Sequence, residues 1–155
     1  MNTIELSKAV PEFTCATINN EAMTLSSLKG KNVIIYFYPK DNTPGCTQEG
    51  QDFRDLYGEF QNANTEIFGV SRDSIRVHKG FKEKYAFPFE LISDPDESLC
   101  ELFDVIKQKK LYGKEYMGIE RSTFLINSDG VLVQEWRKIK VKGHVDEVLT
   151  AINNL

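Results

Sequence analysis

The sequence predicts an α/β fold with a mixed central sheet flanked by helices. Apolar runs of strand length alternate with helical patterns through the middle of the chain, an order typical of strands covered by helices. Two further β runs, 122–127 and 131–136, are joined by Ser128-Asp129-Gly130, a hairpin signal that adds antiparallel pairing. The 155 residues contain no linker, so we expect one domain over residues 1–155.

The first elements come from short β runs near the N-terminus. Residues 13–18 and 23–28 flank Asn19-Asn20-Glu21 and predict a β-hairpin. Cys15 falls in the first arm of this hairpin, where the alternation favours a structural role for its thiol. The next run, Val33 to Tyr38, is apolar without strict alternation, so we expect a central strand that is covered on both faces.

A second strand and its following helix come next. Residues 65–71 predict the strand, and Ser71-Arg72-Asp73-Ser74 is a helix start signal. The helix is expected to run to about Tyr85, with His78 at its surface and without a metal or catalytic role. Residues 89–92 predict another short strand.

The last third of the chain is less regular. Ser93-Asp94-Pro95-Asp96 predicts the cap of a helix, with the proline near the first helical position. The buried stripe of that helix is expected to be Leu99, Phe103 and Ile106, beside Cys100. Residues 107–118 are polar with two glycines and break the pattern. The chain ends in an amphipathic helix, preceded by a surface histidine, His144, with an apolar stripe of Val145, Val148, Leu149 and Ile152.

Composition limits the classes of function. The chain carries a net charge of −4 with interspersed acidic and basic residues, so we expect no nucleic-acid partner. The basic run 137–142 is the exception: it favours an exposed edge strand with lysines facing water, and a patch that binds nucleic acid or another anion is the alternative. No apolar run is long enough to cross a membrane, and residues 1–10 show no signal peptide. Three cysteines suit a reducing compartment, so we expect a cytoplasmic location.

The central strand leads through a Pro- and Gly-containing loop to Cys46, where a helical pattern begins. A helix start stabilises an anion, and the thiolate is the nucleophilic form of cysteine. Cys46 lies about two turns before a buried helical face, so its thiol is expected to point into a pocket mouth, with Gly50 leaving room. That face consists of Phe53, Leu56, Tyr57 and Phe60. An inert buried cysteine is the alternative.

These residues resemble a known family. Pro39, Thr43 and Cys46 fit the Pro-x-x-x-Thr-x-x-Cys signature of peroxiredoxins, and residues 38–49 are similar to the bacterioferritin comigratory protein branch, also called the Q branch. Later segments over 68–71, 91–96 and 121–130 extend the likeness along most of the chain. The resemblance implies a thioredoxin-like fold with an added N-terminal hairpin, and a thiol peroxidase that uses no metal or other cofactor.

The resemblance also implies the residues of the site. Cys46 attacks the peroxide and becomes a sulfenic acid. The Thr43 hydroxyl, the backbone N–H groups of Gly45 and Cys46, and Arg121 are the expected hydrogen-bond donors. Glu49 is a candidate to orient the guanidinium, or else a favourable acid in the first helical turn. Pro39 is expected to shape and shield the pocket.

Two routes back to the thiol are compatible with the sequence. The position five residues after Cys46 is Gln51, and residues 81–86 contain no cysteine. The positions where members of this branch usually carry a resolving cysteine therefore carry other residues. We expect a one-cysteine-like cycle regenerated by thioredoxin or another thiol. An atypical cycle resolved by Cys100 or Cys15 is the alternative, and it needs disulfide reach.

Three other functions are alternatives to a thiol peroxidase. A thiol–disulfide oxidoreductase would want Cys-x-x-Cys, but position 49 is a glutamate. A non-catalytic thioredoxin-fold binding module, with a structural cysteine, is the second. An FMN protein of flavodoxin type, suggested by the α/β pattern alone, is the third. No long exposed apolar stripe is visible in the sequence, which favours a monomer.

Overall fold

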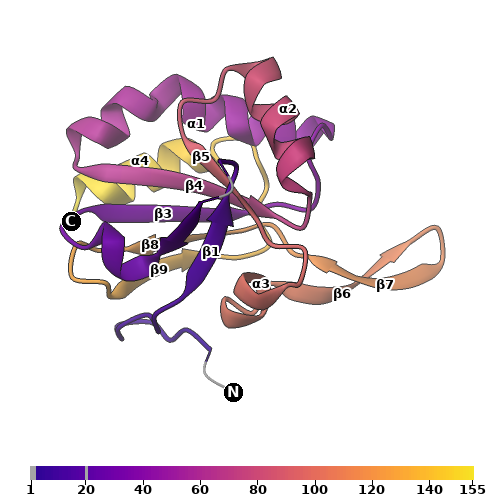
Figure 1. The fold of residues 1–155 in the computed structure, drawn as a ribbon, viewed down its shortest axis with the longest axis horizontal. Helices are drawn as coiled ribbons and strands as arrows, with labels where there is room; N and C mark the ends of the chain where they lie inside the picture. Colours follow the sequence, from indigo (N-terminus) through magenta and orange to yellow (C-terminus); the bar gives the residue numbers. More distant parts are fainter. Residues whose placement is uncertain (1–2, 20) are drawn as a thin grey trace.

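The structure, a computed structural model, describes residues 3–19 and 21–155. Its centre is a sheet in the strand order β2-β1-β5-β4-β3-β8-β9 (Figure 1). The central strand β3 (Asn32–Phe37) pairs in parallel with β4 (Thr65–Ser71) and antiparallel with β8 (Ser122–Ile126). The mixed sheet is therefore confirmed. The other strands of this sheet are β1 (Thr14–Thr17), β2 (Ala22–Thr24), β5 (Glu90–Ser93) and β9 (Leu132–Trp136).

Helices cover both faces of the sheet, as Figure 1 shows. They are α1 (Pro44–Asn62), α2 (Ile75–Tyr85), the short α3 (Ser98–Leu102) and α4 (His144–Asn153). Successive side chains of β3 point to opposite faces. Ile34 and Tyr36 belong to the cluster that α1, α2 and α4 cover, whereas Ile35 and Phe37 belong to the cluster with α3. The strand is buried on both sides, as its unbroken apolar run predicts.

The predicted N-terminal hairpin is present with a shorter second arm. β1 pairs antiparallel with β2, and Thr14 lies opposite Thr24. The arm predicted over 23–28 turns instead into a 3₁₀ helix at Leu25–Leu28. Asn20, in the predicted turn, lies outside the described residues. β1 also pairs with β5, which joins the hairpin to the main sheet.

The segment 107–118, expected to be irregular, forms a second hairpin. β6 (Ile106–Leu111) and β7 (Lys114–Ile119) pair along their whole length and project from the body of the molecule (Figure 1). Tyr112 and Gly113 form the turn, and both have positive φ, 51° and 78°, as a tight two-residue hairpin turn requires. Because both faces of this ribbon are largely exposed, the sequence has no apolar alternation to reveal it.

Three further expectations about the last third of the chain are wrong. The helix after β5 begins at Ser98, so Pro95 is not in its first turn. Asp94 accepts hydrogen bonds from the N–H groups of Leu99 and Cys100, at 3.1 and 2.8 Å, and so caps the helix from outside. The helix ends before Ile106, which opens β6.

The third concerns the basic segment 137–142, which is not an edge strand, because β9 ends at Trp136. The Arg137 guanidinium instead donates to the carbonyls of Asp104 and Phe103, at 2.8 and 3.0 Å. Among the helices of the described residues, none is long and apolar enough to cross a membrane.

Candidate active site

Cys46 is the third residue of α1, directly after the loop that leaves β3. Thr43 precedes the helix as its N-cap residue in an extended conformation, and Pro44 occupies the first helical position. The N–H groups of Gly45 and Cys46 have no acceptor within the helix, because they belong to its first turn. The first turn contains no acidic residue. The positive end of the helix dipole therefore faces the Cys46 sulfur without a competing side-chain anion in that turn.

Arg121 connects Cys46 with Glu49. Its Nη2 donates to Cys46 Sγ at 3.3 Å, and its Nη1 donates to Glu49 Oε1 at 2.6 Å. Arg121 lies just before β8, whereas Cys46 and Glu49 lie about one turn apart on α1. The planar fork of a guanidinium can reach both groups at once, which an ammonium could not. One arm is fixed by the carboxylate, so the other arm is aimed at the sulfur.

Glu49 is fully buried and Arg121 is half-buried, and both burial and the opposite charges shift their pKa values. Burial raises the pKa of Glu49 to about 7, although Arg121 opposes the shift. Burial lowers the pKa of Arg121, but the opposite charges of Glu49 and Cys46 outweigh this effect and leave it raised. Within the described residues, Glu49 Oε2 and the Tyr36 hydroxyl are buried without a hydrogen-bond partner. The second carboxylate oxygen therefore faces a low-dielectric core, which explains the direction of the Glu49 shift.

Two glycines of α1 permit close approaches at the site. A Cβ at Gly45 would lie 3.2 Å from Arg121 Nη2, and a Cβ at Gly50 would lie 2.5 Å from Cζ of Phe87. Gly50 was expected to leave room below the thiol, but the Phe87 ring fills this space, so no open pocket lies there.

The Cys46 thiol is buried under α1. Cys46 is 2% exposed and belongs to the core cluster under α1. A groove between α1 and the start of α4 has a lining that includes Gly45, Gln48, Leu56, Val141, Lys142 and Val145 but not Cys46, so the thiol does not open into this groove as the expected pocket mouth would require.

The remaining predicted site residues lie in the loop before α1. Pro39 is half-buried and follows the last core residue of the strand segment, Tyr38. The Thr43 hydroxyl donates to the Lys40 carbonyl at 2.8 Å rather than toward the sulfur. The structure therefore brings Arg121 and Glu49 to Cys46, while the Thr43 hydroxyl proton is engaged within the loop.

The other two cysteines lie on the opposite face of the sheet. Cys100 and Cys15 pack in or against the cluster that contains Ile35 and Phe37, whereas Cys46 packs in the cluster that contains Tyr36. All three thiols are free. Burial raises the pKa of Cys15 to about 12 and raises that of Cys100 further, with the Asp94 carboxylate adding to both shifts.

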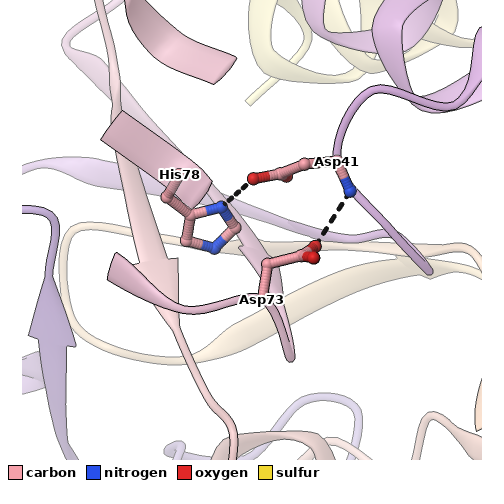
Figure 2. A group of neighbouring side chains, drawn as sticks. All are labelled: Asp41, Asp73 and His78. Carbon is pink, nitrogen blue, oxygen red and sulfur yellow. Dashed lines mark hydrogen bonds and ion pairs between the residues drawn. The ribbon is translucent and has the colours of Figure 1, made fainter. Parts of the chain in front are cut away.

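Both histidines were expected at the surface, and both are buried. His144, at the start of α4, shares a hydrogen bond with the Thr123 hydroxyl at 2.8 Å. Burial, with Arg121 nearby, lowers its pKa to about 4, so it is neutral at pH 7. His78 is fully buried and its Nδ1 lies 2.6 Å from Asp41 Oδ2 (Figure 2). Neither contact has a sequence signal, because the partners are 21 and 37 residues apart.

The group around His78 has the composition of a metal site but is organised differently. Asp41, Asp73 and His78 place potential ligand atoms within 4.8 Å of one another. Asp41 Oδ1 already accepts from the Tyr38 hydroxyl at 2.6 Å, and Asp73 Oδ2 accepts from the Asp41 N–H at 2.8 Å. The carboxylate oxygens that could bind a metal therefore already accept hydrogen bonds within a network.

Comparison with known proteins identifies the family. Residues 6–135 match the model of the AhpC/TSA family. The chain is 51% identical to peroxiredoxin Bcp of Xanthomonas campestris over 149 residues, 96% of this chain and 93% of the relative. It is 50% identical to peroxiredoxin Bcp of Bacillus subtilis over 153 residues, 99% and 98% of the two chains.

Solved structures agree with the sequence relatives. A Xanthomonas campestris bacterioferritin comigratory protein, whose structures concern alkyl peroxide reduction, superposes with a TM-score of 0.90 at 49% identity, covering 99% of this chain and 98% of the other. The thioredoxin-like peroxiredoxin fold and the predicted family resemblance are thereby confirmed. The chain belongs to the AhpC/TSA family, and it is a thiol peroxidase similar to the Bcp, or Q, peroxiredoxins.

Proposed function

We propose that Cys46 is the peroxide-reacting cysteine and that Arg121, Glu49 and the start of α1 form its active site. The observation that carries this proposal is the 3.3 Å contact between Arg121 Nη2 and Cys46 Sγ at the positive end of a helix. The cation and the unpaired N–H groups at the helix start place hydrogen-bond donors for negative charge beside one sulfur. They also converge where an oxygen bonded to that sulfur would lie.

The reaction follows from this geometry. The Cys46 thiolate attacks the terminal oxygen of a hydroperoxide, an S–O bond forms, and the O–O bond breaks. The sulfur is oxidised to a sulfenic acid, and the leaving oxygen takes a proton and departs as water or an alcohol. Because negative charge moves from sulfur to oxygen, donors beside the sulfur stabilise the transition state more than the ground state.

Thiol ionisation alone gives a limited rate gain. An unperturbed cysteine is only a few per cent thiolate at pH 7, so full ionisation raises the reactive fraction by roughly thirtyfold. A hydrogen bond from a charged donor contributes about 1.5–3 kcal/mol, roughly 10- to 150-fold in rate if realised only in the transition state. The fixed arm of Arg121 and the N–H groups of Gly45 and Cys46 can therefore outweigh ionisation.

We further propose a one-cysteine-like cycle. The sheet lies between Cys46 and the other two cysteines, and both of their thiols have raised pKa values that disfavour the nucleophilic form. An external thiol, such as thioredoxin, then attacks the sulfenic sulfur, water leaves, and a second thiol reduces the mixed disulfide. The sequence shows no long exposed apolar stripe, so we propose that the protein is a monomer.

Two measurements test these proposals. Cys46→Ser should abolish consumption of hydrogen peroxide and of an alkyl hydroperoxide such as cumene hydroperoxide; turnover that survives would refute the role of Cys46. Intact mass after one equivalent of peroxide separates the cycles. We expect a gain of one oxygen at Cys46, trapped by dimedone, and a loss of two hydrogens that depends on Cys100 would refute the one-cysteine cycle.

A further inference from the structure

The loop between β3 and α1 is anchored at Asp41, which lies between Pro39 and Thr43. The Asp41 carboxylate accepts from the Tyr38 hydroxyl at 2.6 Å and contacts His78 Nδ1 at 2.6 Å. Its own N–H donates to Asp73 Oδ2 at 2.8 Å, as Figure 2 shows. Three contacts therefore fix a single residue in the middle of the loop that leads to Cys46.

Both ring nitrogens of His78 make hydrogen bonds. His78 Nε2 lies 2.9 Å from the Ile92 carbonyl, which can only accept, so Nε2 carries a hydrogen. The other nitrogen faces an oxygen of Asp41 at 2.6 Å, so a proton also lies between these two groups. His78 and Asp41 are thus hydrogen-bonded to each other while both are fully buried, which offsets the cost of burying two polar groups.

The network ties the loop to rigid parts of the fold. His78 lies on α2, and Ile92 lies on β5. Asp73, which holds the Asp41 N–H, accepts from the Ser71 hydroxyl at 2.6 Å at the end of β4. The next loop residue, Asn42, has a positive φ of 65°, a conformation that needs support from its surroundings.

We propose that His78 is a positioning residue of the peroxidase site, which acts through Asp41 to hold the Pro39–Thr43 loop in the conformation that peroxide needs. The inference rests on the proposed role of Cys46. It extends the site to a histidine that touches neither the sulfur nor Arg121 in the described contacts. A displacement of about 1 Å in a positioning element can lower a rate about a hundredfold, so the loss of this anchor should be measurable.

Two substitutions of His78 separate its hydrogen bonds. An asparagine amide nitrogen lies close to the place of ring Nδ1, so His78→Asn keeps a donor toward Asp41 and loses the bond to Ile92. A glutamine amide nitrogen lies close to the place of Nε2, so His78→Gln keeps the bond to Ile92 and loses the donor toward Asp41. Asp41→Asn is the conservative partner variant, because its amide can donate to Nδ1 while its oxygen still accepts from Tyr38.

Each variant is measured with two reagents. The second-order rate with hydrogen peroxide depends on the loop, whereas alkylation of Cys46 by iodoacetamide depends on the thiolate but not on peroxide alignment. We expect His78→Gln to lower the peroxide rate at least about tenfold and to change alkylation less than about threefold. His78→Asn and Asp41→Asn should each retain a peroxide rate within about threefold of wild type.

Several outcomes would overturn the proposal. They are a wild-type peroxide rate in His78→Gln, equal losses in the asparagine and glutamine variants, or parallel losses of the peroxide and alkylation rates. If His78→Gln does not fold, Tyr38→Phe replaces it, since it removes only the hydroxyl that donates to Asp41; an unchanged peroxide rate there would overturn the proposal as well.

A control separates general destabilisation from positioning. Tyr57→Phe removes a 2.8 Å hydrogen bond from α1 to Glu66, away from the loop, and should keep the wild-type peroxide rate. Failure of the proposed function is distinguishable, because it would appear as wild-type activity in Cys46→Ser, whatever the His78 variants do.

Discussion

Replacement of Glu49 by glutamine should stabilise the protein in a pH-dependent way. The carboxyl is fully buried, and its pKa is raised from an ordinary 4.5 to about 7, chiefly by burial. In the unfolded chain it ionises near 4.5. Between these two values the folded state binds more protons than the unfolded state, so the free energy of unfolding falls as pH rises.

The magnitude follows from the size of the shift. One pKa unit corresponds to about 1.4 kcal/mol, so a shift from 4.5 to about 7 lowers the free energy of unfolding by about 3 kcal/mol once the pH exceeds 7. Below pH 4.5 this penalty is absent, because Glu49 is protonated in both states. A glutamine keeps an oxygen that can accept from Arg121 and has no charge to desolvate, so it escapes the penalty.

The assay is urea unfolding of wild type and Glu49→Gln between pH 4 and 8. The difference in unfolding free energy should increase by about 3 kcal/mol from pH 4 to pH 8 in favour of the variant. Groups that both proteins share, such as His144, cancel in this difference. Glu59→Gln, an exposed glutamate on the same helix, is the control for the loss of one negative charge from α1. A difference that stays constant with pH, or that favours wild type more at pH 8, would refute the reasoning.

Two other predictions concern α1 and its guanidinium partner. Arg121→Lys should lower kcat/KM for peroxide roughly 10- to 150-fold, because a compact ammonium cannot contact Cys46 and Glu49 together. A kcat/KM within threefold of wild type in steady-state assays would count against the contact of one guanidinium with both groups. Gly50→Ala should lower the free energy of unfolding by about 1–3 kcal/mol, since its Cβ would lie 2.5 Å from Phe87 Cζ. The matched control is Gly58→Ala on the same helix, where a Cβ meets nothing within 4 Å. This variant should raise the free energy of unfolding by about 0.5–1 kcal/mol in the same urea experiments. Equal effects in the two variants would exclude the steric explanation.

The sequence was most informative where local pattern and burial agree. The central strand β3, the strand β4 and the start of α2 at Ser74 all match their predicted positions. In each case the signal that predicts the element, an apolar run or a capping residue, lies within the element or directly before it. Ser74, for example, accepts a hydrogen bond from the N–H of Val77, three residues away.

The wrong predictions have one of two physical causes. Either the contact that places the residue joins positions far apart in sequence, or the element is exposed and has no apolar pattern. His78 sits among charged residues in sequence, so its burial depends on a partner 37 residues earlier in a different element. The hairpin β6–β7 is held by its ladder and by a turn at Tyr112, which is 96% exposed, so no apolar pattern marks it. Arg121 could be placed near Cys46 only through family resemblance, because the two are 75 residues apart.

In the site that we propose, two pairs of side chains, Glu49 with Arg121 and His78 with Asp41, orient their neighbours. Glu49 holds one arm of Arg121 and thereby aims the other at Cys46, while its burial destabilises the folded protein above pH 4.5. His78 and Asp41 are hydrogen-bonded to each other at 2.6 Å, and Asp41 lies in the loop before α1. An apolar core at these positions would be more stable, but it would leave the guanidinium and the loop free to rotate. Since peroxide is small and offers few contacts of its own, alignment has to come from groups that are fixed before it binds, and buried pairs supply that rigidity.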